Sequence, residues 1–329
     1  MRQAFTYDDV ALVPQFNNIP SRTEPSLESW LTRNKKVGIP LLAANMDTVI
    51  SYDLAQVLIN AGSVPIFHRF SDMDAQIKWV KHFEGKTFIS CGIQKLDETR
   101  KLLDLGALGV CIDVAHGHSD RMFRFIEEIK KTHPDKDVIA GNVCTAMAYH
   151  DLVNAGADAV KVGVGPGAAC TTRMVTGFGV PQFTAVQDCA RIAEKLRVPL
   201  IADGGIRTSR DVVLALAAGA STVMVGKLFA LTQESASPKL NGKAKFRGQA
   251  SADFQMEFYG GLKEKTVAEG IDFWAPVSGS AEELINQLLG GVRSGMTYGG
   301  GKNLKELQRK AEFVQVTSSY IHESKPRPE

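Results

Sequence analysis

The sequence predicts an α/β fold, a (β/α)8 TIM barrel, because short apolar runs rich in β-branched residues alternate with longer amphipathic segments. Near-continuous apolar strands are typical of a parallel sheet that is buried on both faces, and eight strand–helix units can close into a barrel. An open doubly wound sheet is the alternative, but no G-x-G-x-x-G sequence follows the first run, which disfavours it. The eight runs are 40–44, 63–68, 87–91, 108–114, 138–143, 159–164, 199–204 and 222–226.

Helical periodicity fills the intervals between the runs, and glycine follows several of these segments, as it often does at helix C-termini. Two later segments, 281–291 and 303–311, are expected to be helices that close the fold. The helices expected between the runs are 52–61, 75–82, 96–105, 121–132, 146–155, 185–196 and 209–218, and the glycines are Gly62, Gly106, Gly156 and Gly219.

Two segments lie outside the eight units. Residues 1–38 are expected to form an N-terminal arm, and residues 232–302 a cover and closing segment, since long loops in a compact domain are usually lids or disordered. Within the second segment, residues 259–270 are expected to be a mobile cover. We expect the whole chain, residues 1–329, to form a single catalytic domain.

Composition narrows the class of protein. A net charge of +2 gives no support for nucleic-acid binding, and no apolar run approaches the ~20 residues that a membrane span needs. The five cysteines are scattered and form no C-x-x-C pair, so neither a disulfide framework nor a zinc site is indicated. The beginning of the chain lacks the apolar core of a signal peptide, and a reducing cytoplasm is the expected location.

Polar residues and glycines follow the ends of the predicted strands, where TIM barrels place their active sites. Helix capping would explain any one of these clusters, but it does not readily explain seven of them in register. The clusters are 45–47, 68–69, 113–116, 141–142, 163–172, 203–205 and 226–227.

The segment 161–173, with the sequence KVGVGPGAACTTR, is the most informative of them. Its glycines permit a tight turn whose backbone can approach a ligand, and Cys170 on that turn is placed to be a nucleophile. The alternative is a free thiol buried beside a turn, which is the usual state of a single cysteine. The residues around Cys170 favour the nucleophile.

These motifs resemble the IMP dehydrogenase/GMP reductase family over nearly the whole chain. The matching segments are 7–14 (YDDVALVP), 43–49 (AANMDTV), 140–143 (AGNV), 163–173 (GVGPGAACTTR), 201–205 (IADGG) and 293–298 (RSGMTY). The resemblance implies a TIM barrel, a purine nucleotide substrate, a nicotinamide cofactor and a homotetramer.

Within the family, the chain is more similar to the reductase branch. Dehydrogenases usually insert CBS modules after the second strand, and they carry an Arg-Tyr pair on a long flap. Here only one helix separates residues 68 and 87, no arginine lies between Gln255 and Glu269, and no Arg-Tyr dipeptide occurs. Segments 203–209 and 219–224 look closer to the dehydrogenases.

The resemblance therefore implies NADPH-dependent conversion of GMP to IMP and ammonia. The alternatives are an IMP dehydrogenase without CBS modules and a catalytically silent nucleotide-binding protein. A binding protein needs no nucleophile or proton relay, so the combination of Cys170, Thr172 and Glu269 disfavours the last alternative. In the reductase reaction Cys170 forms a thioimidate with C2 of the purine, and Thr172 and Glu269 pass a proton to the leaving amine.

The resemblance also implies the binding residues. Asp203 accepts the ribose hydroxyls and glycine turns hold the phosphate, while Lys227 either contacts the phosphate or points to solvent. Backbone carbonyls of Gly165, Gly167, Cys170 and Arg173 resemble a potassium site. The remaining nucleotide residues are Gly204, Gly205, Gly226, Gly248, Gln249, Ala250, Ala268 and Gly270, and the cofactor residues are Ser21, Arg22, Arg69, Asp113, Val114, Ala115, Gly165, Ser294 and Thr297.

Overall fold

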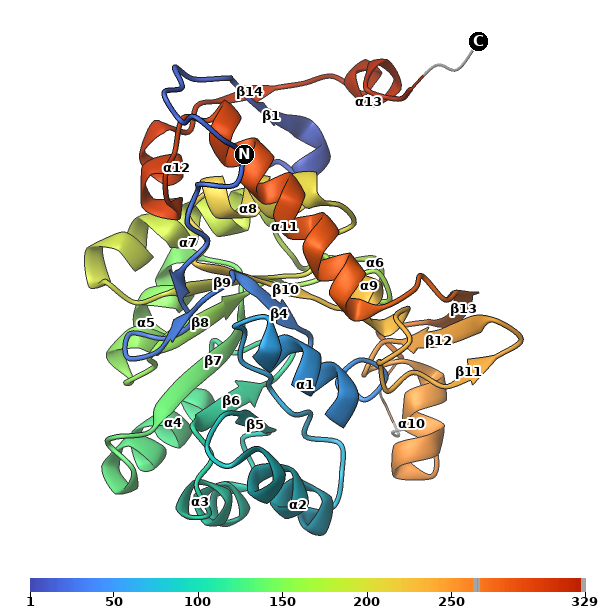
Figure 1. Ribbon diagram of the computed structural model, residues 1–329. Helices are drawn as coiled ribbons and strands as arrows, with labels where there is room; N and C mark the ends of the chain where they lie inside the picture. The colour runs from blue at the N-terminus through green and yellow to red at the C-terminus, as the bar shows by residue number, and fades with distance from the viewer. Residues whose placement is uncertain (263–264, 266, 327–329) are drawn as a thin grey trace.

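The computed structural model describes residues 1–262, 265 and 267–326, and at its centre lies a curved parallel sheet of seven strands (Figure 1). Helices surround these strands in a ring, as the alternation of apolar runs and helical segments predicts. The strand order is β4-β10-β9-β8-β7-β6-β5. The strands are β4 (Leu41–Ala43), β5 (Phe88–Cys91), β6 (Gly109–Asp113), β7 (Asp137–Val143), β8 (Ala159–Val162), β9 (Leu200–Asp203) and β10 (Thr222–Val225).

The run 63–68 differs from the prediction, because it forms a single bridge in place of a full strand. Ile66 pairs in parallel with Phe88 of β5, and on the other side the hydroxyl of Ser63 donates to a carbonyl of β4 at 2.5 Å. Pro65 has no N–H to give to a ladder, which accounts for the missing strand. The run still occupies the place of the second unit, so the α/β barrel is confirmed with this strand reduced to a bridge.

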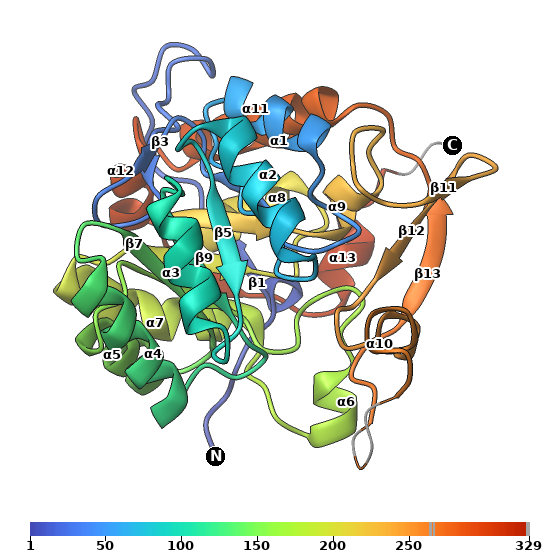
Figure 2. The ribbon, with the colours of Figure 1, turned by 90° about the horizontal axis from the view of Figure 1, so that it is seen from below.

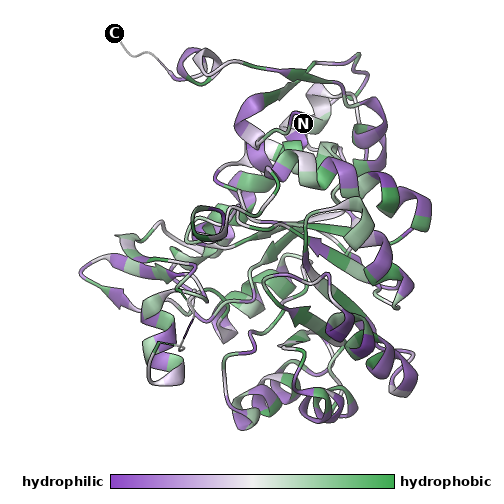
Figure 3. Cartoon of the chain, turned by 180° about the vertical axis from the view of Figure 1, so that it is seen from behind, coloured by the Kyte–Doolittle hydropathy of each residue, from purple (hydrophilic) through white to green (hydrophobic). Residues whose placement is uncertain are grey.

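The helices present apolar faces to the sheet and polar faces outward (Figure 3). Side chains of Ser51, Asp72, Ser119 and Thr145 accept backbone N–H groups at four helix N-termini. The four predicted glycines all follow helix ends with φ between 87° and 113°, which an L side chain rarely adopts. The helices are α1 (Tyr52–Asn60), α2 (Met73–Phe83), α3 (Leu96–Asp104), α4 (Asp120–Thr132), α5 (Ala146–Asn154), α7 (Gln182–Leu196), α8 (Ser209–Ala217) and α9 (Lys227–Ala230).

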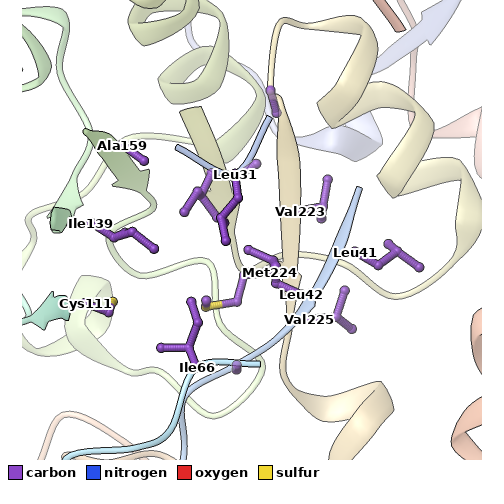
Figure 4. Packing of buried hydrophobic residues seen from close by; sticks show 14 of the residues in the cluster. Leu31, Leu41, Leu42, Ile66, Cys111, Ile139, Ala159, Val223, Met224 and Val225 are labelled. Carbon is purple, nitrogen blue, oxygen red and sulfur yellow. The ribbon is translucent and has the colours of Figure 1, made fainter. Parts of the chain in front are cut away.

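The N-terminal arm closes the amino end of the barrel. Strands β2 (Ser29–Trp30) and β3 (Lys36–Val37) form a hairpin whose Leu31 is fully buried among core side chains of the strands (Figure 4). The Thr32 hydroxyl donates to Asp137 at the start of β7, at 2.5 Å. This hairpin leaves the opposite end of the barrel, at the carboxyl ends of the strands, open for a site.

Much of the predicted cover segment is regular structure. A three-stranded antiparallel sheet and helix α10 lie together beside the barrel (Figures 1 and 2). Helix α11 extends seven residues beyond the prediction, because Gly291 and Gly295 leave room for Ser209 and Val213 of α8 and close packing offsets their poor helix propensity. These elements are β11 (Lys239–Leu240), β12 (Lys243–Arg247), β13 (Asp272–Pro276), α10 (Ala252–Tyr259) and α11 (Ala281–Tyr298).

The remaining elements connect the two ends of the chain. Strand β1 (Val10–Leu12) pairs antiparallel with β14 (Phe313–Gln315), and α13 (Ser319–Glu323) projects beyond them (Figure 1). The others are the 3-10 turn η1 (Tyr7–Asp9), α6 (Thr172–Thr176) and α12 (Leu304–Lys310). Within the described residues, no helix combines the length and the apolar character that crossing a membrane requires.

Candidate active site

The carboxyl ends of the strands border a cavity of about 470 Å³. Each of the seven predicted polar clusters contributes to its lining, so the structure brings them together at one end of the barrel. Two further segments complete the wall, namely the arm at residues 6–8 and the segment 246–250. The lining includes Asn45, Arg69, Asp113, Asn142, Gly163, Cys170, Asp203, Gly226, Gly248 and Glu269.

The cysteine loop is hydrogen-bonded to the end of the cover. Cys170 pairs with Gly270 in an antiparallel bridge, and the backbone N–H of Thr171 donates to the carbonyl of Glu269 at 3.1 Å. The Cys170 thiol donates to the Thr172 hydroxyl at 3.2 Å. Thr172 and Glu269 both line the cavity, so the structure brings the three predicted catalytic residues to one wall.

Arg173 braces the same loop from behind. Its guanidinium donates to the carbonyl of Val164 at 3.1 Å and to that of Val180 at 2.6 Å. Gly165 has φ 85°, and a β-carbon there would lie 2.5 Å from the Arg173 side chain. Glycine at 165 is therefore required both by the turn and by the arginine.

The residues predicted to bind a monovalent cation all lie on this loop. The Gly167 carbonyl accepts the N–H of Cys170 at 3.0 Å, and the Arg173 carbonyl accepts that of Gly177 at 3.1 Å. A carbonyl oxygen has two lone pairs, so each keeps one for a cation. Carbonyl oxygens suit a hard cation, and these residues fit the group they are predicted to hold.

A buried charged network forms the floor of the cavity. The Lys161 ammonium donates to Asp203 at 2.7 Å and to Asp113 at 3.1 Å, while Arg69 lies 3.8 Å from the other oxygen of Asp113. Asn142 donates to Asp203 at 3.0 Å. Burial lowers the pKa of Lys161, but the two carboxylates outweigh it and hold that pKa well above its usual range.

Sequence reasoning assigned no role to Lys161, although a signal was available. A lysine inside the apolar run 159–164 is buried if that run is a central strand, and a buried ammonium requires a charged partner. Gln182, whose side-chain amide donates to the carbonyls of Val162 and Asp203, was also missed. Nothing in its local sequence distinguishes it from an ordinary helix residue.

Most of the predicted nucleotide residues line the cavity. Gly204 and Gly205 have φ 95° and 82°, and a β-carbon on Gly204 would lie 2.9 Å from Pro166, so the turn after β9 requires glycine. Lys227 begins α9, and its ammonium lies 5.5 Å from the centre of the Phe273 ring. The residues that line the cavity are Asp203, Gly204, Gly205, Gly226, Lys227, Gly248, Gln249 and Ala250.

The other two predicted nucleotide residues, Ala268 and Gly270, do not line the cavity, although Gly270 pairs with Cys170, which does. The segment 265–270, which the family resemblance implies holds the edge of the purine base, is described in part. Residues 263, 264 and 266 lie outside the described residues.

The predicted cofactor residues fall into two groups. Arg69, Asp113, Val114, Ala115 and Gly165 line the cavity, whereas Ser21, Arg22, Ser294 and Thr297 do not. The Arg22 guanidinium lies 5.7 Å from the ring centre of Tyr298, at the end of α11, which also carries Ser294 and Thr297. That the arm reaches the cofactor of a neighbouring subunit stays a prediction.

A second charged cluster joins the cover to the barrel. Arg247 of β12 donates to Asp47 from Nε at 3.0 Å and from Nη2 at 2.5 Å, and also to Asp253 and Glu257. His68 lies near Asp47, and burial lowers its pKa from 6.5 to about 4, with a smaller opposing effect of that carboxylate. Arg247 directly precedes the Gly248–Ala250 turn, so this cluster fixes one edge of the cavity.

The family model described as the IMP dehydrogenase / GMP reductase domain matches residues 4–327. Inosine-5′-monophosphate dehydrogenase of Borreliella burgdorferi is 34% identical, covering 99% of this chain and 97% of its own. Human GMP reductase 2 is also 34% identical, covering 94% of each. A crystal structure of a GMP reductase variant from Trypanosoma brucei with guanosine 5′-monophosphate superposes with a TM-score of 0.92, at 27% identity, covering 100% of this chain and 98% of that one. The chain belongs to the IMP dehydrogenase/GMP reductase family.

Proposed function

We propose that this enzyme is a GMP reductase, which converts GMP to IMP and ammonia with NADPH. The composition of the cover carries the proposal. The end of the cover, residues 269–271, is hydrogen-bonded to the cysteine loop and carries Glu269. The sequence between Gln255 and Glu269 contains no arginine. The resemblance assigns activation of water in the dehydrogenases to a flap Arg-Tyr pair, which this chain lacks.

The residues on the cavity wall suit loss of an amino group. Cys170, as the thiolate, adds to C2 of the purine and makes that carbon tetrahedral, and ammonia then leaves to give a thioimidate. The Thr172 hydroxyl, with Glu269 on the same wall, delivers the proton that the leaving amine requires. When NADPH is bound, it supplies the hydride to C2, and the thiolate of Cys170 departs as IMP forms.

The remaining groups bind and orient. Asp203 accepts the ribose hydroxyls, and the N–H groups of the glycine turns at 204–205 and 226 hold the phosphate. Asp113 and Arg69 take the nicotinamide side of the cavity. A potassium ion on the carbonyls of the cysteine loop would fix the path of that loop. A homotetramer, a single catalytic domain and a cytoplasmic location stay predictions.

IMP dehydrogenase is the second candidate function. Relatives with that name include the enzymes of Borreliella burgdorferi and Cryptosporidium parvum, which are 34% and 35% identical to this chain. Segments 203–209 and 219–224 also look closer to the dehydrogenases. In that reaction the same thioimidate would form from IMP and NAD⁺ and would then be hydrolysed by water.

Two assay mixtures distinguish the candidates. The purified enzyme, with potassium present, receives GMP with NADPH or IMP with NAD⁺, and the absorbance of the reduced nicotinamide is followed. A fall in the first mixture with stoichiometric ammonia supports the reductase, whereas a rise in the second with XMP formed supports the dehydrogenase. No change in either would favour a silent nucleotide-binding protein. The Cys170→Ala variant is the control for both reactions.

A further inference from the structure

Lys161 reaches across the interior of the barrel from the middle of β8. Its side chain is 3% exposed, and its ammonium contacts Asp203 on the neighbouring strand β9 and Asp113 on β6, two strands away. Gly141 of the intervening β7 leaves the space for it, because a β-carbon there would lie 2.6 Å from that of Lys161. The Lys161 side chain therefore links three strands of the sheet, and glycine at 141 is required to accommodate it.

The hydrogen bonds leave one oxygen of each carboxylate for other donors. Lys161 and Asn142 both donate to Oδ2 of Asp203, and no described residue donates to its Oδ1. Lys161 contacts Oδ1 of Asp113, and Arg69 lies 3.8 Å from its Oδ2. Both aspartates line the cavity. Each can thus accept a ligand hydroxyl while it stays bound to the same ammonium.

The charge balance depends on Lys161. Two carboxylates and the cations Lys161 and Arg69 together carry no net charge. Without the ammonium, the largely buried carboxylates of Asp113 and Asp203 would face each other, and like charges at close range disfavour ionisation of both. One carboxylate would then take up a proton or move away, and a ligand would lose its acceptor.

We propose that Lys161 is a positioning residue that holds the carboxylates of the nucleotide and cofactor subsites together, and so couples the binding of the two ligands. The proposal rests on the proposed function for one point, the assignment of Asp203 to the nucleotide ribose and Asp113 to the nicotinamide cofactor. The first ligand orders the shared ammonium and its second carboxylate, and the second ligand then binds a site that is already arranged.

The test measures binding, so it does not depend on which reaction the enzyme catalyses. Calorimetry gives the Kd of IMP and of GMP, each with and without saturating NADP⁺, for the wild type, Lys161→Met and Lys161→Arg. In the wild type we expect NADP⁺ to tighten nucleotide binding at least about fivefold. In Lys161→Met we expect both ligands to bind at least about tenfold more weakly. The ratio of the nucleotide Kd without NADP⁺ to that with NADP⁺ should fall to about one. Lys161→Arg keeps the cation and should retain part of the coupling.

Lys130→Met is the matched control. This variant removes another lysine–aspartate ion pair, in which Lys130 Nζ lies 2.9 Å from Asp158 Oδ2. Neither residue lines the cavity, so the coupling should stay unchanged. If Lys161→Met does not fold, Asp113→Asn replaces it, and this variant should lose the coupling.

Three results would overturn the proposal. Normal coupling in Lys161→Met, or in Asp113→Asn where that variant takes its place, means that the lysine has a structural role only. Equal coupling losses in Lys130→Met and Lys161→Met would show an indirect effect of stability. A wild-type protein that binds neither IMP nor GMP would refute the proposed function as well, which separates the two failures.

Discussion

Replacing Arg247 with methionine should destabilise the enzyme and loosen the edge of the nucleotide site. The Arg247 side chain is 9% exposed and its guanidinium donates twice to Asp47, whose side chain is 14% exposed. Methionine keeps a long apolar side chain but provides no donor, and it also loses the guanidinium that lies over the Phe254 ring, 5.2 Å from its centre. The change therefore removes the charged partner of Asp47 together with this weaker contact.

The expected loss in the free energy of unfolding depends on how each carboxylate is placed once Arg247 is gone. Glu257 is 70% exposed, so its pair contributes little, and Asp253 keeps Lys245 at 2.6 Å. Among the described residues, Asp47 has no second cation to take the place of Arg247. Its Oδ1 is already buried without a hydrogen-bond partner, and the variant would leave Oδ2 without one as well. Removing one member of a buried pair costs about 3–5 kcal/mol, and we expect about 3 kcal/mol here because Asp47 is not fully enclosed.

Urea unfolding, followed by fluorescence, measures the free energy of unfolding. Lys245→Met is the control, and it should cost less than about 1 kcal/mol because Lys245 is more exposed and its partner Asp253 keeps Arg247. Adding Asp47→Asn to Arg247→Met should restore part of the loss, since it removes the unpaired charge. An Arg247→Met protein within about 0.5 kcal/mol of the wild type would refute this account of the cluster.

Three further predictions concern single residues. Cys170→Ala should lose turnover by orders of magnitude while calorimetry still detects nucleotide binding, and full reductase activity in this variant would exclude the thioimidate. Gly163→Ala should destabilise the fold by more than about 2 kcal/mol in urea, since φ is 152° and the new β-carbon would lie 2.0 Å from the Asp203 carbonyl; an unchanged midpoint would contradict the geometry. The free energy of unfolding should fall as the pH drops from about 6.5 to about 4, because the unfolded chain protonates His68 while burial keeps it neutral in the folded protein, and His68→Gln should show a shallower pH dependence than the wild type.

The barrel and the location of the site could be predicted from sequence because both depend on local patterns. Alternating apolar runs define the strands, and the polar clusters that follow them converge because parallel strands end at the same edge. The run 63–68 differed for a local reason as well, the proline at 65. The end of α11 was missed because Gly291 and Gly295 are poor helix formers whose place depends on α8.

The charged networks could not be predicted in the same way. The contact of Lys161 with Asp113 requires the order of three strands and the register of each, which no local pattern contains. Arg247 and Asp47 are 200 residues apart in sequence, and their pairing depends on how the small antiparallel sheet docks on the barrel. In both cases the sequence indicates only that a buried charge needs a partner, without naming it.

The hydrogen bonds of the cover connect it to the loop that carries Cys170, the proposed nucleophile. The backbone of 269–271 bonds to 169–171 on one side, and Glu269 and Gly270 contact Ala250 and Ser251 on the other. Movement of residues 269–271 would therefore displace the Cys170 loop and the Gly248–Ala250 turn together. The Cys170 loop, Glu269 and the Gly248–Ala250 turn consequently form one hydrogen-bonded backbone unit. We expect differences between reductase and dehydrogenase chemistry in this family to arise from the length and composition of the sequence before residue 269, which is where this chain lacks the arginine.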